Sequence, residues 1–262
     1  MIEFMKQTAR EAGQLMLSAR AGTTACVTHL KAGNELVTST DLAADALIST
    51  AIRQRYPGHE ILAEESAPEL GKQGSGAASL WIVDPIDGTV NFAHGHYQSA
   101  VSIAFAEQGQ LKAGVVYNPF LDEMFWAQAG AGAYLNSQRI QVAGKTDLRR
   151  ALVATGFPYD KDDLEPLFRQ LAVVLRHCAD IRRLGSAALD ICWVAMGRLD
   201  AYYESLSIWD FAAAQLIATE AGACYGHFKP VPEGVSPVFH NKNILVSNQA
   251  LFPRLQELLL QA

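Results

Sequence analysis

The chain has 262 residues, of which 50% are hydrophobic and 18% are charged. That length suffices for one large domain or two modest ones, and the apolar content can build a core, which excludes a disordered chain. The formal net charge of −6 argues against general binding to nucleic acid or to an anionic membrane surface, because both attract cationic proteins.

Cysteine usage and the first residues indicate the compartment. The four cysteines are widely spaced and show neither a CxxC motif nor Cys/His ligand spacing, so we expect free thiols in a reducing environment. Residues 1–20 carry apolar side chains at helical spacing, which predicts an amphipathic helix and not a signal peptide. No run approaches 18 apolar residues, so we expect no membrane span and a cytoplasmic protein.

The predicted elements of the first half are two helices followed by short strands. The second helix runs from Ser39 to Tyr56, where Pro57–Gly58 stops it. A stretch rich in Gly, Ser and Ala, Pro68 to Ser79, is expected to be a surface loop. The later strands alternate with turn residues, as in an antiparallel meander. The expected strands are Ile61–Ala63, Leu80–Val83, Ala100–Ala106, Leu111–Tyr117 and Glu123–Ala127.

The second half alternates strands and helices, which is an α/β rhythm. The change falls near Gly144–Arg150 and predicts an N-terminal α+β domain, residues 1–146, and a C-terminal α/β domain, residues 147–262. The expected strands are Ala151–Thr155, Asp200–Tyr203 and Ile244–Ser247, and the expected helices are Asp162–Cys178, Ser186–Met196, Trp209–Ala221 and Asn248–Leu260.

The segment Trp81–Thr89 carries the strongest chemical signal, because an apolar run ends in two acids three residues apart. Pro85 restricts Asp84 to extended geometry, so the turn from Asp84 to Thr89 can direct Asp84 and Asp87 to one side. Like charges placed together are costly without a cation, and carboxylates suit Mg²⁺. Taken alone, the segment can equally be an Asp-rich turn with a helix cap.

Three further acids stand where predicted elements begin or end. Glu64 follows a strand, Asp41 lies in the first turn of a helix, and Asp210 starts another helix. Helix capping explains each helical acid equally well when it is considered alone. Together these acids occupy element ends, where loops commonly build active sites.

The order and spacing of these segments resemble the inositol monophosphatase family, within the lithium-sensitive, metal-dependent phosphatase superfamily. The resemblance implies an α/β (α+β) fold: the layered αβαβα sandwich of inositol monophosphatase and fructose-1,6-bisphosphatase. It covers nearly the whole chain. The matching blocks are Leu36–Asp41, Ala63–Ser66, Trp81–Phe92, Arg183–Asp190, Ile208–Asp210 and Thr219–Gly222.

The resemblance implies a site for two or three Mg²⁺ ions. Glu64, Asp84 and the backbone carbonyl of Ile86 would hold one ion, and Asp84, Asp87 and Asp210 would hold a second. Such metals stabilise the attacking and leaving oxygens of a displacement at phosphorus.

The resemblance also implies catalytic roles for Glu64, Thr89 and Asp41. Thr89 and Glu64 would orient the attacking water, while Asp41 accepts a hydrogen bond from the Thr89 hydroxyl. No side chain then needs to act as a nucleophile, which agrees with the lack of a Ser-His-Asp or Cys-His pattern.

Eight residues are implied as substrate contacts. Among them Glu204 precedes Asp210 by six positions, whereas related enzymes typically have seven, so its reach to the substrate is open. Val90–Phe92 resembles the inositol-type branch and differs from 3′-phosphoadenosine phosphatases. The implied contacts are Asp87, Gly88, Thr89, Gly185, Ser186, Ala187, Glu204 and Asp210.

The sequence thus predicts a Mg²⁺-dependent phosphomonoesterase for inositol 1-phosphate or a similar polyol or sugar phosphate, a small phosphorylated alcohol. Fructose-1,6-bisphosphatase activity and 3′-nucleotide or NADP phosphatase activity are alternatives on the same scaffold. A non-catalytic regulatory binding protein that retains the fold is the alternative of another class. The resemblance further implies a homodimer and sensitivity to lithium.

Overall fold

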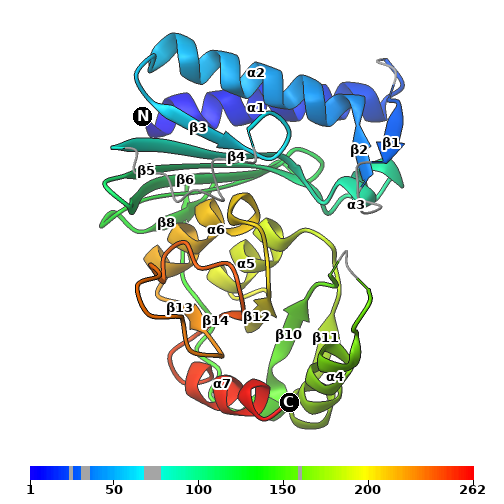
Figure 1. Ribbon diagram of the computed structural model, residues 1–262, viewed down its shortest axis with the longest axis vertical. Helices are drawn as coiled ribbons and strands as arrows, with labels where there is room; N and C mark the ends of the chain where they lie inside the picture. The colour runs from blue at the N-terminus through cyan, green and yellow to red at the C-terminus, as the bar shows by residue number, and fades with distance from the viewer. Residues whose placement is uncertain (24–25, 31–35, 68–77, 159–160) are drawn as a thin grey trace.

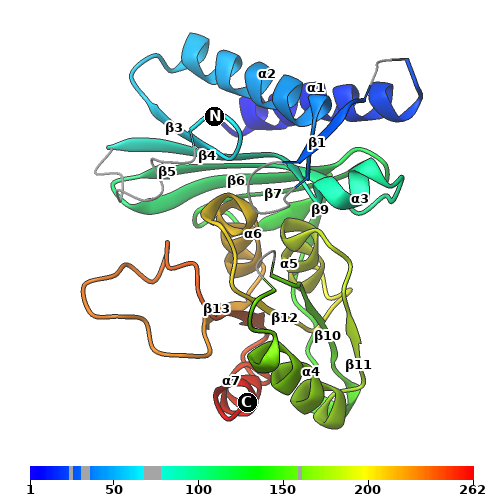
Figure 2. The same cartoon turned by 45° about the vertical axis from the view of Figure 1, so that its right-hand side comes forward.

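The chain folds as alternating layers of helices and sheets (Figure 1). The computed structural model describes residues 1–23, 26–30, 36–67, 78–158 and 161–262. Helices α1 and α2 lie over a seven-stranded sheet, α5 and α6 lie beneath it, a five-stranded sheet follows, and α4 and α7 lie outermost (Figures 1 and 2). The expected αβαβα sandwich is confirmed.

The first helical layer is amphipathic, as its sequence predicts. Helix α1 (Ile2–Arg20) buries Met5, Ala9, Ala12 and Met16, whose spacing of three and four places them on one face. This face packs on α2 (Ser39–Arg55) and on the central strands of the sheet, and together they form an outer core.

The seven-stranded sheet is antiparallel except for its first pair of strands. Its order follows the sequence from β3 to β9, and only β3 and β4 run parallel. Two short strands, β8 and β9, extend the expected meander. The strands are β3 (Glu60–Ala63), β4 (Ser79–Asp87), β5 (Ala100–Glu107), β6 (Gln110–Asn118), β7 (Glu123–Gln128), β8 (Ala133–Leu135) and β9 (Gln138–Ile140).

The five-stranded sheet mixes parallel and antiparallel pairs in the order β11-β10-β12-β14-β13. Its strands β11 and β13 were not anticipated from the sequence; β11 has three residues, Asp-Ile-Arg, and so contains no apolar run. The strands are β10 (Leu152–Thr155), β11 (Asp180–Arg182), β12 (Ala201–Glu204), β13 (Cys224–His227) and β14 (Ile244–Ser247).

The central core lies between the two sheets. Helix α5 (Ala187–Ala195) has every residue buried, and α6 (Ile208–Glu220) is buried along most of its length. This core takes residues from both halves of the chain. The two-domain division at residues 146 and 147 therefore stays a prediction.

The remaining elements cover the outer edges. Helices α4 (Glu165–His177) and α7 (Phe252–Leu260) pack on the far face of the five-stranded sheet. Both begin later than the sequence suggested, because each has a proline in its first turn, where the missing N–H costs nothing. A two-stranded ribbon, β1 (Thr28–Leu30) with β2 (Leu36–Thr38), precedes α2.

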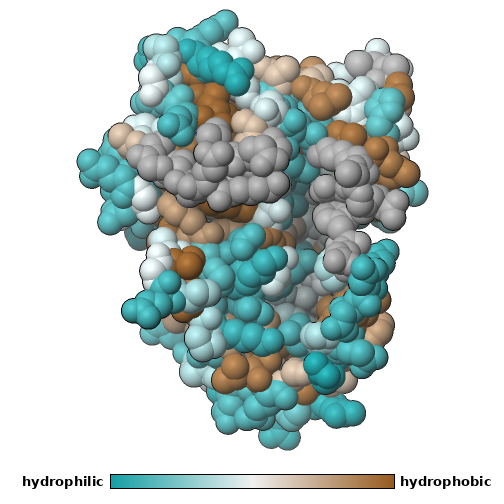
Figure 3. Space-filling model, in the orientation of Figure 1, coloured by the Kyte–Doolittle hydropathy of each residue, from teal (hydrophilic) through white to brown (hydrophobic). Residues whose placement is uncertain are grey.

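Of the loop expected from Pro68 to Ser79, residues 68–77 lie outside the described residues, and Ser79 belongs to β4. Among the described helices, none is long and apolar enough to cross a membrane. On the face shown in Figure 3, apolar residues form small patches among hydrophilic ones.

Gly114 of β6 sets the distance between the seven-stranded sheet and α6. A Cβ atom at this position would lie 2.7 Å from the backbone oxygen of Ala213 and 3.1 Å from its Cα. Because backbone cannot move aside as a side-chain end can, a larger residue would push α6 away from the sheet.

We expect Gly114→Ala to lower the free energy of unfolding by about 1–3 kcal/mol through overpacking. Gly144→Ala is the matched control, because a Cβ there meets no atom within 4 Å. Denaturant unfolding of both variants is the measurement. Equal stabilities for the two variants would contradict the close approach of β6 and α6.

Candidate active site

A β-bulge in β4 places Asp84 and Asp87 on the same face of the sheet. Residues three apart in a regular strand point to opposite faces. Here Asp84 pairs with Ser102 and Asp87 pairs with Ala100, so β4 has one more residue between these pairs than β5 has. The extra residue reverses the alternation, as bulges do.

The packing of the intervening residues agrees with this reversal. Ile82 packs in the central core, and Asp84, two residues later, has the same orientation. Ile86 packs instead in the outer core, which leaves Asp87 facing α5. The two acids thus lie in the last part of a strand, and the sequence-based expectation of a turn from Asp84 to Thr89 was wrong.

Asp87 binds the N-terminus of α5. Its carboxylate accepts hydrogen bonds from the Ser186 hydroxyl at 2.5 Å, from the Ala188 amide at 2.7 Å and from the Ala187 amide at 3.3 Å. Helix N-termini favour negative charge because their first N–H groups have no partner within the helix. Gly185, Ser186 and Ala187 were expected to contact substrate. In the structure, the Ser186 hydroxyl and the Ala187 amide donate hydrogen bonds to Asp87.

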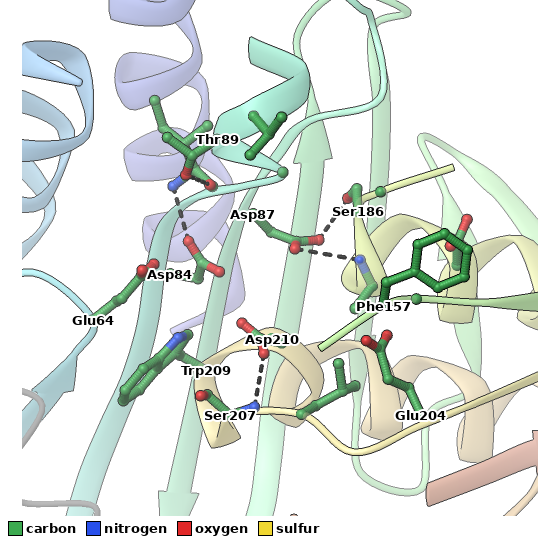
Figure 4. Close-up of a pocket in the computed structure, with 18 of the residues that line it drawn as sticks. Glu64, Asp84, Asp87, Thr89, Phe157, Ser186, Glu204, Ser207, Trp209 and Asp210 are labelled. Carbon is green, nitrogen blue, oxygen red and sulfur yellow. Dashed lines mark hydrogen bonds between the residues drawn. The ribbon is translucent and has the colours of Figure 1, made fainter. Parts of the chain in front are cut away.

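Asp210 approaches the same point from the other side. It lies in the first turn of α6, where one carboxylate oxygen accepts the Ser207 amide at 2.8 Å. One carboxylate oxygen from each of Asp84, Asp87 and Asp210 lies within 4.8 Å of the others. Figure 4 shows the three carboxylates converging, with Glu64 beside Asp84.

These carboxylates repel one another where water has little access. Burial, and then the charges of Glu64, Asp87 and Asp210, raises the pKa of Asp84 well above its ordinary value. Burial raises the pKa of Asp87 to about 6, although its hydrogen bonds from α5 oppose the shift. Burial and neighbouring acids also raise the pKa of Asp210. A divalent cation would relieve this repulsion, so the donor set fits Mg²⁺.

Thr89 and Asp41 form a buried pair next to this cluster. The Thr89 hydroxyl lies 3.0 Å from Asp41 Oδ1 and 3.0 Å from the Ile86 carbonyl oxygen. Asp41 also accepts the amide and the hydroxyl of Thr38, so it both caps α2 and faces Thr89. The expected contact between Thr89 and Asp41 is thus present, and the capping interpretation of Asp41 also holds.

Gly88 makes the close approach of three segments possible. Its φ of 90° lies in the region that favours glycine, and a Cβ would lie 2.7 Å from the Gln98 oxygen and 2.9 Å from the Gly185 oxygen. The short helix α3 (Thr89–Ala93) starts directly after it. A side chain at Gly88 would therefore separate β4 from the turn before α5.

The acids border a cavity of about 260 Å³ whose far wall comes from the second half of the chain. Glu204, at the end of β12, lines this cavity despite its shorter spacing to Asp210. Tyr202 donates a hydrogen bond to Glu204, and burial raises the pKa of Glu204 to about 7. In Figure 4, Glu204 and Phe157 lie across the cavity from Glu64.

All the site residues that the resemblance implied line this cavity, with the exception of Asp41. Asp41 lies behind the wall and contacts the cavity-lining Thr89 by a hydrogen bond. Their catalytic and binding roles stay predictions. Sequence reasoning gave no role to Asp190, Tyr202 and Arg183, which also line the cavity. Asp190 carries a visible signal, because it is the one acid in the otherwise apolar segment of α5.

A family model described as the inositol monophosphatase family matches residues 1–262. The chain therefore belongs to this family. It is 40% identical over 250 residues to a protein of Vibrio cholerae named Nus factor SuhB, covering 95% of this chain and 91% of that one.

Two solved structures support the same assignment. The extragenic suppressor protein suhB from Bartonella henselae superposes with a TM-score of 0.87 at 34% identity, covering 98% of this chain and 97% of that one. An IMPase from Thermotoga maritima gives a TM-score of 0.86 at 30% identity, covering 99% and 96%.

We expect Mg²⁺ to stabilise the protein through the acidic cluster. A ligand that binds only the folded state adds about 2.7 kcal/mol at 100 times its Kd, so Tm should rise with added Mg²⁺. Asp84→Asn should remove most of this rise. Without metal, Asp84→Asn should be at least as stable as the wild type, because it removes one charge from the cluster. Thermal unfolding with Mg²⁺ and with chelator measures both effects, and a Mg²⁺ response unchanged in Asp84→Asn would contradict the site.

Proposed function

We propose that this protein is a Mg²⁺-dependent phosphomonoesterase that acts on inositol 1-phosphate or a similar polyol or sugar phosphate. The observation that carries the proposal is the convergence of Asp84, Asp87 and Asp210 beside the Thr89–Asp41 pair. Membership of the inositol monophosphatase family supports it.

The donor set is suited to hard cations. Asp84, Asp87, Asp210, Glu64 and the Ile86 carbonyl would hold two or three Mg²⁺ ions, all through oxygen ligands. When bound, Mg²⁺ lowers the pKa of a coordinated water and offsets the charge of the phosphate and its leaving oxygen.

The protein's own groups position the water. The Thr89 hydroxyl has a single proton, and Asp41, when ionised, is a stronger acceptor than the Ile86 carbonyl. With that proton directed to Asp41, the lone pairs of the Thr89 oxygen are available to accept a hydrogen bond from water. Glu64, on the same side of the cavity, is the second group we assign to orienting the water.

The far wall favours hydroxyl groups over a second phosphate. Glu204 and Asp190 both line it, and their carboxyl oxygens can accept a hydrogen bond from a hydroxyl group, whereas a phosphate dianion has no proton to donate. This argues for a polyol or simple sugar phosphate over fructose-1,6-bisphosphate or a 3′-nucleotide. Arg183 is the cation that lines the same part of the cavity.

Release of inorganic phosphate tests the proposal. We expect hydrolysis of inositol 1-phosphate with Mg²⁺, loss of activity in excess chelator, and no turnover by Asp84→Asn. Full activity in chelator would refute the metal-dependent mechanism. A panel with fructose-1,6-bisphosphate, a 3′-nucleotide and NADP ranks the substrates.

Li⁺ inhibition and a homodimeric state in the cytoplasm are further proposals from the family resemblance.

A second candidate function comes from the relatives' name. The Vibrio cholerae relative is called a Nus factor, which favours the regulatory alternative considered from the sequence. The discriminating experiment replaces that relative by this chain and by its Asp84→Asn variant in cells. If both restore Nus-factor function while only the wild type hydrolyses phosphate, the two functions are separate properties of one protein.

We expect Thr89→Ala to retain Mg²⁺-dependent stabilisation but to lower kcat by about 10²-fold or more, because a misplaced reactant costs this much. Thr89→Ser keeps the hydroxyl and should retain most of the activity. Steady-state kinetics with parallel thermal unfolding is the measurement. Near wild-type kcat in Thr89→Ala would leave Thr89 with only a structural role.

A further inference from the structure

Asp190 is a buried acid without a structural explanation. It lies in the first half of α5 among apolar residues, is 2% exposed, and lines the cavity of the acidic cluster. Its Oδ1 atom is buried and has no hydrogen-bond partner among the described residues. Leaving a buried polar group unpaired is destabilising, so a purely structural role does not account for an acid here.

Helix capping does not explain Asp190 either. The groups that satisfy the start of α5 are the Asp87 carboxylate and the Ser186 hydroxyl, which accepts the Leu189 amide. The Asp190 amide already donates to the Ser186 carbonyl oxygen at 3.0 Å, as in a regular helix. The Asp190 side chain is therefore not needed by the backbone around it.

Asp190 lies between the metal acids and the far wall of the cavity, because charges from both sides act on it. Burial, with the charges of Asp87 and Glu204, raises the pKa of Asp190 well above its ordinary value, and the charge of Arg183 opposes the shift. Glu204 is also part of this wall, and the Tyr202 hydroxyl is directed to one of its oxygens. The wall thus offers two carboxyl groups to a molecule in the cavity.

Glu204 and Arg183 are held at this wall by their immediate neighbours. A Cβ atom on Gly156 would lie 2.1 Å and 2.2 Å from the two carboxyl oxygens of Glu204, so only glycine permits the observed position of Glu204. Arg183 lies over the Phe157 ring, 5.2 Å from its centre, which holds the guanidinium at the edge of this wall.

We propose that Asp190 is a specificity-determining residue that hydrogen-bonds a hydroxyl group on the alcohol part of the substrate, next to the hydroxyl that Glu204 recognises. This proposal rests on the proposed phosphatase function. The substrate class is that of the proposed function, and what is new is the role given to Asp190 in recognising it. An aryl phosphate lacks such hydroxyls and would leave Asp190 unpaired.

The test compares two substrates, inositol 1-phosphate and p-nitrophenyl phosphate. In Asp190→Ala we expect kcat/KM for inositol 1-phosphate to fall about 10-fold or more, the loss of one strong hydrogen bond, with little change for p-nitrophenyl phosphate. Tm in the absence of substrate should stay equal or rise, because an unpaired buried acid is removed. Asp190→Asn, which keeps an acceptor oxygen and the size, should lose less.

Asp200→Ala is the matched control, because Asp200 is also buried and also has an unpaired Oδ1, but it does not line the cavity. Its other oxygen accepts the Lys145 ammonium at 2.8 Å and the Leu152 amide at 2.7 Å. We therefore expect Asp200→Ala to lower Tm and to leave the ratio of the two kcat/KM values unchanged.

The outcomes separate the two proposals. If the wild type hydrolyses neither substrate, the proposed function fails. If the wild type hydrolyses both and Asp190→Ala affects both equally, or neither, then Asp190 does not recognise hydroxyls and this inference is overturned. Should Asp190→Ala fail to fold, the ratio of the two kcat/KM values in Asp190→Leu, which keeps the size but removes both oxygens, decides: an unchanged ratio overturns the inference, and a selective loss supports it.

Discussion

The site depends on holding several carboxylates together where water is largely excluded. Burial raises the pKa of Asp84, Asp87 and Asp210, the charge of Asp87 raises the pKa of the other two further, and each acid is a source of instability without a counter-charge. The fold opposes this repulsion with fixed backbone dipoles. Asp87 faces the N-terminus of α5, and Asp210 accepts an amide at the start of α6. The helices between the two sheets therefore stabilise the acids as well as the core.

The geometry of this arrangement comes from irregular features of regular elements. The bulge in β4 turns Asp87 toward α5, and Gly88 lets β4 and the turn before α5 approach closely. Gly114 in turn allows α6 to lie against the sheet, so that Asp210 reaches the cluster. Each of these features costs local regularity, which is common where a site must be preorganised.

The two ends of the cavity have different chemistry. On one side are the acids that fit Mg²⁺ and the Thr89–Asp41 pair; on the other are Glu204 and Asp190 with a single guanidinium, Arg183. The first side is suited to phosphate with metal, and the second to a neutral, hydroxyl-bearing group. A buried carboxyl oxygen without a partner, such as Asp190 Oδ1, lowers stability, which is a common property of residues retained for binding.

The amino-acid sequence alone determined the amphipathic helix α1 and the position of the acids at the ends of helices and strands, whereas the layered fold and the expected set of metal ligands came from the resemblance to a known family. The first two depend on local signals: helical spacing in Met5 to Met16, and the order of acids around Asp84. The resemblance to a known family then supplied the roles of Glu64, Thr89 and Asp41 that spacing could not.

Tertiary structure decided what depends on contacts between distant segments. Whether Glu204 lines the cavity was undecidable from its spacing to Asp210, because the path of β12 beside β10 and β14 sets its position. The short strands β8, β9, β11 and β13 gave no clear pattern, since three or four residues carry too little periodicity and pair only through their neighbours. Asp190 could be seen as an acid in an apolar helix, but only the packing of α5 against the cavity shows that its Oδ1 atom is buried there without a partner among the described residues.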